Sequence, residues 1–578
     1  MIYQQRGNCS DIKEWVDEHP IPSTDKKYHF DLKDAPDRIK TAISKGENIT
    51  VIGDYDVDGV CASAIMATAI RELGGNVTIR LPLRFSEGYG MKPSMVDEIS
   101  SGLVLTVDNG ITAHEAVKAA KAKGLEVVVT DHHGVSKEMV PVIKDGLVCQ
   151  EERVVLPEAD CIVNPHVEET LGIEGRYDFY DYCGAGVALK IAESVLGEKH
   201  PVMDKLYAYA ALATVADVMP LVEDNRNIVI RGIDAMARGE ISPGLYQLLA
   251  QNKIDLNSVP ETVPPHCYIT SDTLGYKIAP CINAASRLLD DGAYRALTCL
   301  LADKNSTGLA AALDLIKLNE QRKLITEQEQ KQVADIVEKM KPEDRRSLVV
   351  YLRDCAPGII GLHAGRLCEQ YGVPVVVIGG AGDKCKGSCR APENANIKSL
   401  LDSCQDLLVG YGGHPGAAGL TINESKIDEL RERIEAECIR RDIVPQLSDA
   451  IEYDVVVPAS EIGEAIKSIE RLAPFGMGNP EPVVCVPDCA IEEARILGGK
   501  HLKIDGTISA IGFNMCDGSF DVSQLEGGSC PLVGVLGYNC FRGDAKPQLQ
   551  IIGIPEEHEL DILRGVDDIA EDDIDFDD

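Results

Sequence analysis

The segment ITVIGDYDVDG (residues 49–59) joins a run of apolar, mostly β-branched residues to three aspartates and a glycine. The apolar run is typical of a buried strand, and the helix-like stretch CASAIMATAIRELGG (61–75) follows it. Further strand-like runs come at VTIRLPL (77–83), VLTV (104–107) and EVVVT (126–130). Strands that alternate with helices at this spacing predict a parallel α/β sheet.

Polar side chains follow three of these strands at the point where each strand ends. They are Asp54, Asp56 and Asp58 after the first run, Asp108-Asn109-Gly110 after VLTV, and Asp131-His132-His133 after EVVVT. Parallel sheets bind ligands at the carboxyl ends of their strands, so we expect these groups to lie together. Carboxylates gathered in one place repel one another, and divalent cations neutralise them. The mixed oxygen and nitrogen set suits Mn²⁺, Mg²⁺ or Zn²⁺. Two such ions about 3.5–4 Å apart would promote in-line attack of an activated water on phosphorus.

Each motif taken alone has a plainer interpretation. An aspartate after a strand is often a turn residue or a helix N-cap, and an isolated histidine pair is more often a hydrogen-bonded surface feature. Asp-x-Asp-x-Asp-Gly also begins a calcium loop, but Ile65 stands where that loop needs a glutamate. The complete set, in order and at successive strand ends, favours a metal site.

The rest of the chain divides by pattern. Residues 185–240 are helix-like, and Leu309–Lys341 is free of glycine and proline, which predicts a long helix. A second α/β unit ends in the glycine-rich loop YGGHPGAAG (411–419), and short strands with turn signals follow. We expect an N-terminal extension (1–48), a catalytic domain (49–300), a connecting helix (301–343), a smaller α/β substrate domain (344–445), a β-barrel (446–554) and an acidic disordered tail (555–578).

Composition sets the class of protein. The 578 residues are 44% hydrophobic and 26% charged, and no apolar run reaches the 18 residues of a membrane span. The start of the chain lacks the features of a signal peptide, so we expect a cytoplasmic protein. The 19 cysteines include no Cys-x-x-Cys, which favours reduced, buried thiols. The net charge of −36 opposes nucleic-acid binding. However, −11 of this charge lies in the last 24 residues, and an overall negative charge is compatible with a local basic groove.

Four ordered motifs, GDYDVDG, VDNGI, TDHH and ATVADVMPL, resemble those of the DHH phosphoesterase family. Further motifs resemble the RecJ branch of that family: RFSEGYG (84–90), NPH (164–166), CGAGVALK (183–190), INAASRL (282–288), LNEQRK (318–323), KGSCR (386–390), GGHPGAAG (412–419) and PFGMGNPEP (474–482). The resemblance covers roughly residues 45–554. It implies a DHH catalytic domain, a DHHA1-type substrate domain and an OB-like barrel. The implied activity is a metal-dependent 5′-to-3′ exonuclease that degrades single-stranded DNA to 5′-mononucleotides in repair, recombination and replication.

The resemblance also implies roles for the strand-end residues. Two Mn²⁺ ions, or Mg²⁺ in their place, would be held by Asp54, Asp56, Asp58, Asp108, His132 and Asp217. Asp108 would bridge both ions, and Asp217 would complete one shell from a helix. His133 would face the scissile phosphate as a charge stabiliser or proton donor, and Asp131 would orient a histidine.

A second set of residues would bind the substrate. The resemblance places the terminal 5′-phosphate at Arg84, Ser388 and Arg390, and further phosphate contacts at Arg287, Gly412, Gly413 and His414. Arginine grips phosphate through two parallel hydrogen bonds, and glycines let backbone N–H groups approach it. In the barrel, Lys503, Tyr538, Phe541 and Arg542 could form a stacking and basic groove, with a core role for both aromatics as the alternative. The chain departs from the family pattern at Cys281, Cys389, Ala391 and Cys355-Ala356.

Two other functions stay open at this point. One is an RNA or short-oligonucleotide phosphodiesterase of the same family, and the other is a catalytically weak replisome scaffold. The expected partners are single-stranded DNA and, by analogy, a single-strand DNA-binding protein, a helicase or replisome proteins, with no membrane.

Overall fold

The catalytic domain is built on a five-stranded parallel sheet. The structure is a computed structural model that describes residues 2–6, 12–19, 26–144, 147–342, 345–446, 450–516, 522 and 525–555. The sheet has the order β3-β2-β4-β5-β8, and every neighbouring pair is parallel. Its strands are β2 (Asn48–Ile52), β3 (Asn76–Arg80), β4 (Leu103–Val107), β5 (Glu126–Thr130) and β8 (Cys161–Val163). This confirms the parallel sheet predicted from the sequence.

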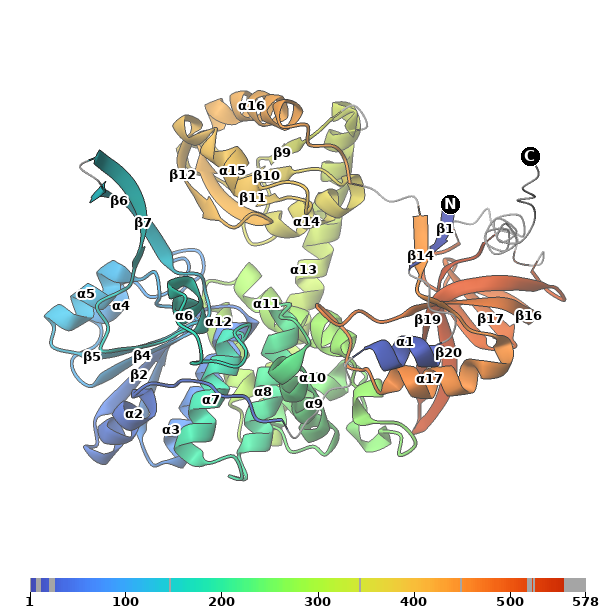
Figure 1. Ribbon diagram of the computed structural model, residues 1–578, viewed down its shortest axis with the longest axis horizontal. Coiled ribbons are helices and arrows are strands. Elements are labelled where there is room, and N and C mark those ends of the chain that lie inside the picture. The colour runs from blue at the N-terminus through green and yellow to red at the C-terminus, as the bar shows by residue number, and fades with distance from the viewer. Residues whose placement is uncertain are drawn as a thin grey trace, which may run out of the picture.

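Helices cover both faces of this sheet (Figure 1). One face packs against α2 (Ala35–Ser44), α3 (Val57–Glu72) and α7 (Gly184–Leu196), and the other against α4 (Pro93–Asp97) and α5 (His114–Ala122). A helical layer then extends the larger core: α6 (Pro165–Leu171), α8 (Met203–Ala216), α9 (Glu223–Ala237), α10 (Pro243–Gln251), the π-helical turn η3 (Thr273–Ile278), α11 (Ala279–Leu288) and α12 (Gly292–Leu300). Among the described residues, no helix combines the length and apolar character of a membrane span.

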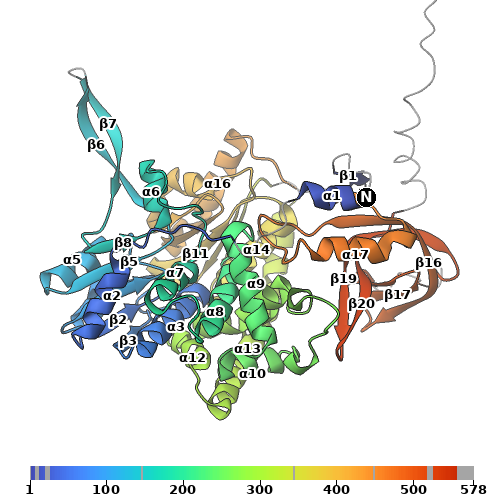
Figure 2. The ribbon, with the colours of Figure 1, turned by 60° about the horizontal axis from the view of Figure 1, so that its bottom comes forward.

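A hairpin that the sequence did not suggest projects from the catalytic domain. It consists of β6 (Ser136–Lys144) and β7 (Leu147–Val155), an antiparallel pair directly after the histidine pair. Figure 2 shows it extending away from the body of the molecule. Since most of its described side chains are exposed, it lacks the buried face that gives a strand a recognisable sequence pattern.

A single long helix connects the two α/β domains. Helix α13 (Asn305–Met340) has 36 residues, which corresponds to about 54 Å. Its first half packs against α10, α11 and α12, and its second half against β9 (Leu348–Leu352) and α14 (Ile360–Tyr371). The long connecting helix predicted from the sequence is therefore confirmed.

The second α/β domain has a mixed five-stranded sheet, ordered β12-β13-β11-β10-β9. Besides β9 and α14, its elements are β10 (Val375–Gly379), β11 (Cys385–Arg390), β12 (Leu408–Gly413), β13 (Ala417–Ile422), α15 (Ile397–Asp402) and α16 (Ile427–Arg440). The glycine-rich segment 411–419 was expected to be a loop, and this was wrong. It forms the β12–β13 hairpin, because its glycines still pair in an antiparallel ladder, with Gly412 opposite Gly419.

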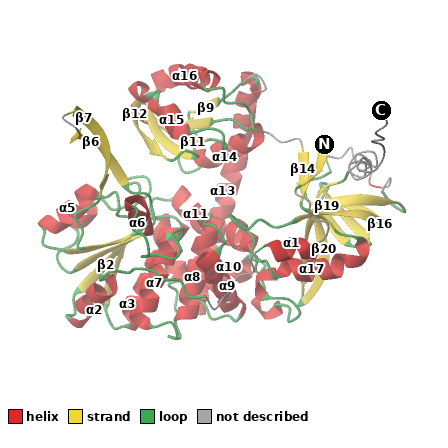
Figure 3. Cartoon of the chain, viewed as in Figure 1, coloured by secondary structure: helices red, strands yellow, loops and turns green. Residues whose placement is uncertain are grey.

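The C-terminal domain contains a closed five-stranded barrel, as the fold prediction required. The ladder runs β16-β17-β18-β20-β19 and closes by pairing β19 with β16. The elements are β14 (Ala450–Tyr453), β15 (Val455–Val456), α17 (Ile462–Glu470), β16 (Val483–Leu497), β17 (His501–Gly506), β18 (Ser509–Gly512), β19 (Ser529–Phe541) and β20 (Asp544–Gly553). Figure 3 shows the barrel strands beside α17. The acidic tail lies outside the described residues, apart from its first residue, Pro555.

The first residues of the chain belong to the C-terminal domain in space, which the sequence did not reveal. Strand β1 (Ile2–Gln5) pairs in parallel with β14. Helix α1 (Ile12–Glu18) packs against α17, and its Trp15 and Val16 enter the core of the barrel domain. The expected N-terminal extension is thus split, since α2 packs on the catalytic sheet instead.

Because Trp15 is only 9% exposed, we expect Trp15→Ala to destabilise the barrel domain by about 3–5 kcal/mol. Hydrogen exchange of β16–β20, measured in the full chain, would report the loss. The matched control is Asp17→Ala, on the exposed face of the same helix, for which we expect less than about 0.5 kcal/mol. Equal protection in both variants would show that α1 does not support the barrel.

Candidate metal centre and phosphate cluster

Three loops at the carboxyl ends of β2, β4 and β5 bring the predicted metal ligands together. Asp56 caps the start of α3 and accepts a hydrogen bond from Gly59 N at 3.1 Å. Asp58 lies in the first turn of α3, and its carboxylate accepts hydrogen bonds from Gly184 N (2.6 Å) and Ala185 N (2.7 Å) at the start of α7. The positive end of α7 therefore orients the Asp58 carboxylate.

Asp108 lies at the middle of the centre in an unusual conformation. Its φ is +60°, in the left-handed region that residues other than glycine adopt infrequently, asparagine and aspartate more often than most. The Asn109 side chain supports this turn by donating to the carbonyls of Ile52 (3.0 Å) and Val107 (2.9 Å). A Cβ on Gly184 would lie 2.4 Å from the Asp108 Cβ, so the glycine leaves room for the carboxylate.

The donor atoms of the centre fit a bound cation. Asp108 Oδ1 is buried and accepts no hydrogen bond from any described residue, although His132 Nε2 lies 3.1 Å away. The same Nε2 is 3.6 Å from Asp58 Oδ2 and 3.8 Å from Asp217 Oδ2. Burial lowers the pKa of His132, which favours the neutral imidazole that binds metals. The ligand atoms of one ion lie close together and do not hydrogen-bond to one another. The donor atoms of this centre have that arrangement.

The predicted ligands form two neighbouring groups, each with its donor atoms within 4.8 Å of one another. They are Asp54–Asp56–Asp108 and Asp58–His132–Asp217. Asp217 was expected within a helix, and it is the residue directly after α8, at the C-cap position. All six predicted ligands thus lie in one cluster.

The buried carboxylates of this cluster repel one another, and a bound cation would stabilise them. Burial and then the charges of neighbouring carboxylates raise the pKa of Asp54, Asp56 and Asp108. Burial, with Asp58 and Asp56, also raises the pKa of Asp217 to about 8. The ionised carboxylates are therefore costly together, and a divalent cation would remove that cost.

A consequence is that the metal-free protein should lose stability as pH rises. A carboxyl whose pKa is raised by folding keeps its proton in the folded state after the unfolded chain has lost it, so alkali favours unfolding. For Asp217 the window is pH 4 to 8. We expect Asp217→Asn to reduce this pH-dependent loss in the free energy of unfolding by about 1–2 kcal/mol. The figure is kept low because the Asp217 side chain is one-third exposed to solvent.

The measurement is a series of melting temperatures at pH 5 to 8.5 in EDTA and in Mn²⁺. Mn²⁺ at about 100 times its Kd should add about 2.7 kcal/mol to the wild-type protein. A metal-free stability that increases with pH in the same window would contradict this account.

His133 is held by Asp131 at the edge of the centre. The Asp131 carboxylate is 1% exposed and accepts from Ile111 N (2.9 Å) and His132 N (2.8 Å). His133 Nδ1 lies 2.8 Å from Asp131 Oδ1. Burial alone would lower the pKa of His133, but the hydrogen bond to Asp131 and its charge outweigh burial and raise that pKa to about 9. Tyr89 also belongs to the site, because its hydroxyl lies 3.1 Å from His133 Nδ1. The sequence analysis did not single out this residue.

Guanidinium groups gather beside the carboxylates, where the two α/β domains meet. Burial and then the charges of Arg84, Arg322 and Arg390 lower the pKa of Arg287 to about 10. Arg287 Nη1 donates to the Gly358 carbonyl (3.0 Å) across the domain junction. Guanidinium groups gathered in this way are suited to bind a phosphate.

The remaining predicted phosphate ligands lie close to this cluster. Arg84 stacks over the Tyr55 ring at 4.6 Å, and Arg390 Nη1 is 3.3 Å from Ser388 Oγ. The tip of the β12–β13 hairpin, which holds Gly412, Gly413 and His414, is exposed, and Arg390 pairs with Ala417 directly after the turn. Arg322 on α13 was missed as an individual residue, although its motif LNEQRK had been noted.

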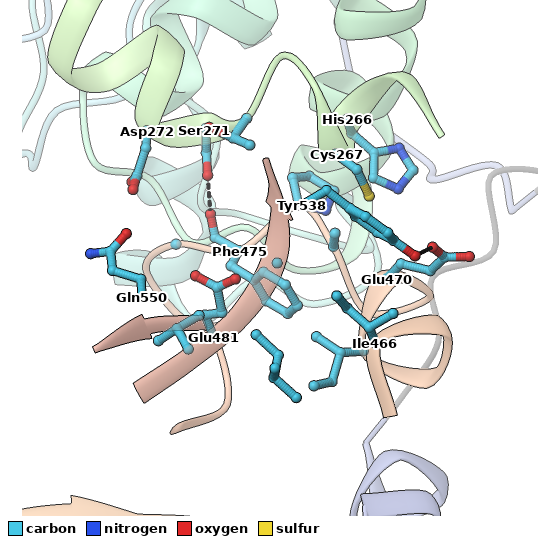
Figure 4. A pocket seen from close by; sticks show the side chains of 18 of the residues that line it. His266, Cys267, Ser271, Asp272, Ile466, Glu470, Phe475, Glu481, Tyr538 and Gln550 are labelled. Carbon is cyan, nitrogen blue, oxygen red and sulfur yellow. Dashed lines mark hydrogen bonds between the residues drawn. The ribbon is translucent and has the colours of Figure 1, made fainter. Parts of the chain in front are cut away.

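Two of the barrel residues predicted to contact nucleic acid make hydrogen bonds within the protein. Lys503 Nζ donates to Asp505 (2.9 Å) and also contacts Ser509. Tyr538 donates to Glu470 (2.9 Å) and lines a cavity of about 390 Å³ between the barrel and the catalytic domain (Figure 4). The Phe541 side chain lies outside the described residues. A nucleic-acid groove at Lys503 and Tyr538 therefore stays a prediction, and binding there would compete with these contacts to Asp505 and Glu470.

Comparison with known proteins agrees with this architecture. Three family models match: the N-terminal domain of the DHH family (residues 48–215), the DHHA1 domain (344–440) and the RecJ OB domain (453–553). The single-stranded-DNA-specific exonuclease RecJ of Bacillus subtilis is 31% identical over 92% of this chain, and that of Salmonella typhimurium is 29% identical over 90%. The chain spans 64% of the Bacillus protein and 89% of the Salmonella protein.

Solved structures of RecJ from Thermus thermophilus match 90% of this chain. The structure with Mn²⁺ has a TM-score of 0.71 at 27% identity and the structure with Mg²⁺ 0.66 at 26%, and the match covers 71% and 70% of those chains. Residues 48–215 therefore form a DHH-family domain, and residues 344–440 form a DHHA1 domain. The OB domain matches that of RecJ, and the chain is similar to RecJ proteins over 90% or more of its length.

Proposed function

We propose that this chain is a divalent-metal-dependent nuclease that degrades single-stranded DNA from the 5′ end to 5′-mononucleotides. One observation carries the proposal: the carboxylate and histidine centre and the arginine cluster share one space. The two groups are close enough to affect each other's ionisation: the charge of Asp56 favours a higher pKa of Arg287, and the charge of Arg84 favours a lower pKa of Asp56. A centre that breaks phosphodiesters therefore lies next to a site that can hold a phosphate.

Two ions, Mn²⁺ or Mg²⁺, would be held by the six residues of the two ligand groups. The related structures that contain Mn²⁺ or Mg²⁺ support a divalent metal here. Bound divalent cations polarise the scissile phosphate and activate water for in-line attack. Oxygen-rich ligands with one imidazole are the set that suits these hard cations.

The chain's own residues would position the strand. The arginine cluster with Ser388 would hold the terminal 5′-phosphate, so that the following phosphate reaches the carboxylates. His133, oriented by Asp131 at 2.8 Å, would stabilise charge on that phosphate or give a proton to the leaving 3′ oxygen. The product is a nucleotide that carries a 5′-phosphate, and the shortened strand again begins with a phosphate.

This activity belongs in DNA repair, recombination and replication. A single-strand DNA-binding protein, a helicase or replisome proteins are the protein partners that we propose. The protruding β6–β7 hairpin and the barrel are the surfaces outside the metal centre where such contacts could form.

The test is release of mononucleotides from matched DNA, RNA and duplex strands in Mn²⁺, Mg²⁺ and EDTA. We expect metal-dependent release from single-stranded DNA, slower release from the duplex and none in EDTA. Faster loss of RNA would instead support the oligoribonucleotide phosphodiesterase. Absence of cleavage together with absence of bound metal would support the scaffold.

A further inference from the structure

A second group of metal-binding side chains lies away from the carboxylate centre. It joins Glu329 of α13, Cys355 in the loop after β9, and His363 of α14. Cys355 Sγ is 3.1 Å and His363 Nε2 is 2.9 Å from the same atom, Glu329 Oε2. All three side chains are buried, with exposures of 8%, 6% and 1% in the order given.

We propose that Glu329, Cys355 and His363 form a structural site for zinc or a similar thiolate-binding divalent cation. Thiolate, imidazole and carboxylate are the ligands that zinc takes in proteins. The carboxylate centre has no sulfur ligand, so the two sites should select different ions. The proposal does not depend on the nuclease assignment.

The two separations from Glu329 Oε2 are slightly shorter than those between ligands of a tetrahedral ion. Zinc bond lengths place neighbouring ligand atoms about 3.4–3.6 Å apart, so the three side chains need to separate by about half an ångström. The other carboxylate oxygen, Glu329 Oε1, accepts from Ala356 N at 2.9 Å, which orients Oε2 toward the thiol and the imidazole. Binding would release the thiol proton to solvent and move the imidazole proton to Nδ1.

The charge of the group supports a cation. Glu329 is a buried carboxylate whose described partners are a thiol, an imidazole and one backbone N–H, with no lysine or arginine among them. A buried carboxylate needs a compensating charge. A divalent ion shared by the three side chains would supply it.

The site would brace the junction between the two α/β domains. Cys355 begins the loop that carries Gly358, and the Gly358 carbonyl accepts from Arg287. The fit is tight, because a Cβ on Gly358 would lie 2.1 Å from the Arg287 carbonyl oxygen. Joining α13, this loop and α14 through one ion would hold Arg287 in the phosphate cluster.

Cobalt spectroscopy separates this site from the carboxylate centre. The metal-stripped full-length chain with Asp108→Asn is titrated with Co²⁺, and the cobalt–thiolate charge-transfer band is recorded. We expect one equivalent of Co²⁺ to produce the band and Zn²⁺ to abolish it. Cys355→Ser should eliminate the band, whereas Cys368→Ser, on α14 but outside the group, should keep it.

Glu329→Gln supplies a test that does not remove the thiol. It retains an oxygen that can accept from Ala356 N but loses the anionic ligand, so the affinity for Co²⁺ should fall at least tenfold. Absence of the band in the folded protein at saturating Co²⁺, a band that survives Cys355→Ser, or an unchanged affinity in Glu329→Gln would each overturn the proposal. The group would then be a metal-free hydrogen-bonded contact.

Discussion

Asp108→Asn is expected to lower kcat for single-stranded DNA at least about 10³-fold, which is about 4 kcal/mol of transition-state stabilisation. Asp108 Oδ1 is a buried atom that accepts no hydrogen bond from the described residues, and it faces His132 Nε2. Asparagine keeps the shape of the side chain but removes the anionic oxygen that would bind the cations. Steady-state release of mononucleotides in saturating Mn²⁺ measures the effect.

In the absence of metal, Asp108→Asn should be at least as stable as the wild-type protein. Burial and the neighbouring carboxylates raise the pKa of Asp108, so removing its charge relieves a cost, and asparagine tolerates the φ of +60° better than most residues. We therefore expect an equal or higher melting temperature in EDTA at pH 8. A large loss of activity with a collapsed melting temperature would mean that Asp108 is structural. Unchanged activity would remove it from the metal centre.

Arg390→Ala is expected to lower kcat/KM about 100-fold on a strand with a 5′-phosphate, and less than about threefold on a strand with a 5′-hydroxyl. The reason is the loss of charge-assisted hydrogen bonds to the terminal phosphate, worth about 2–3 kcal/mol. The measurement compares both strands at equal length and sequence. The difference between them isolates recognition of the strand end.

Arg440→Ala is the matched control, because Arg440 is an exposed arginine of the same domain that pairs with Glu437. It should leave both rates within about twofold. If Arg390→Ala slows the two strands equally, then Arg390 supports binding along the strand, and the terminal phosphate is held elsewhere.

The metal centre could be predicted from the sequence because its ligands follow strands with a clear pattern. Parallel strands bring their carboxyl ends to one edge, so Asp56, Asp108 and His132 had to meet once the strands were recognised. Asp217 was accessible only through the resemblance, since the end of α8 reaches the centre by tertiary packing. Tyr89 and Arg322 lie in the noted motifs RFSEGYG and LNEQRK, but neither was singled out, because an individual tyrosine or arginine is usually a surface residue.

Elements without a one-sided hydrophobic pattern were missed. The β6–β7 hairpin exposes most of its described side chains, so neither period 2 nor period 3.6 marks it. The contact of Trp15 with the barrel joins residues more than 400 positions apart, which no local pattern encodes. The β12–β13 hairpin was taken for a loop because its glycines disfavour strands, although the backbone ladder still forms.

The most direct test of the central claim is digestion of a 5′-phosphorylated single strand labelled at its 3′ end, in Mn²⁺, by the wild-type protein and by Asp108→Asn. If the carboxylate centre cuts beside the phosphate cluster, the wild-type protein releases unlabelled 5′-mononucleotides and the label stays on progressively shorter strands. The variant should leave the strand intact over the same time. Release of the label as the first product, or equal digestion by both proteins, would contradict the account.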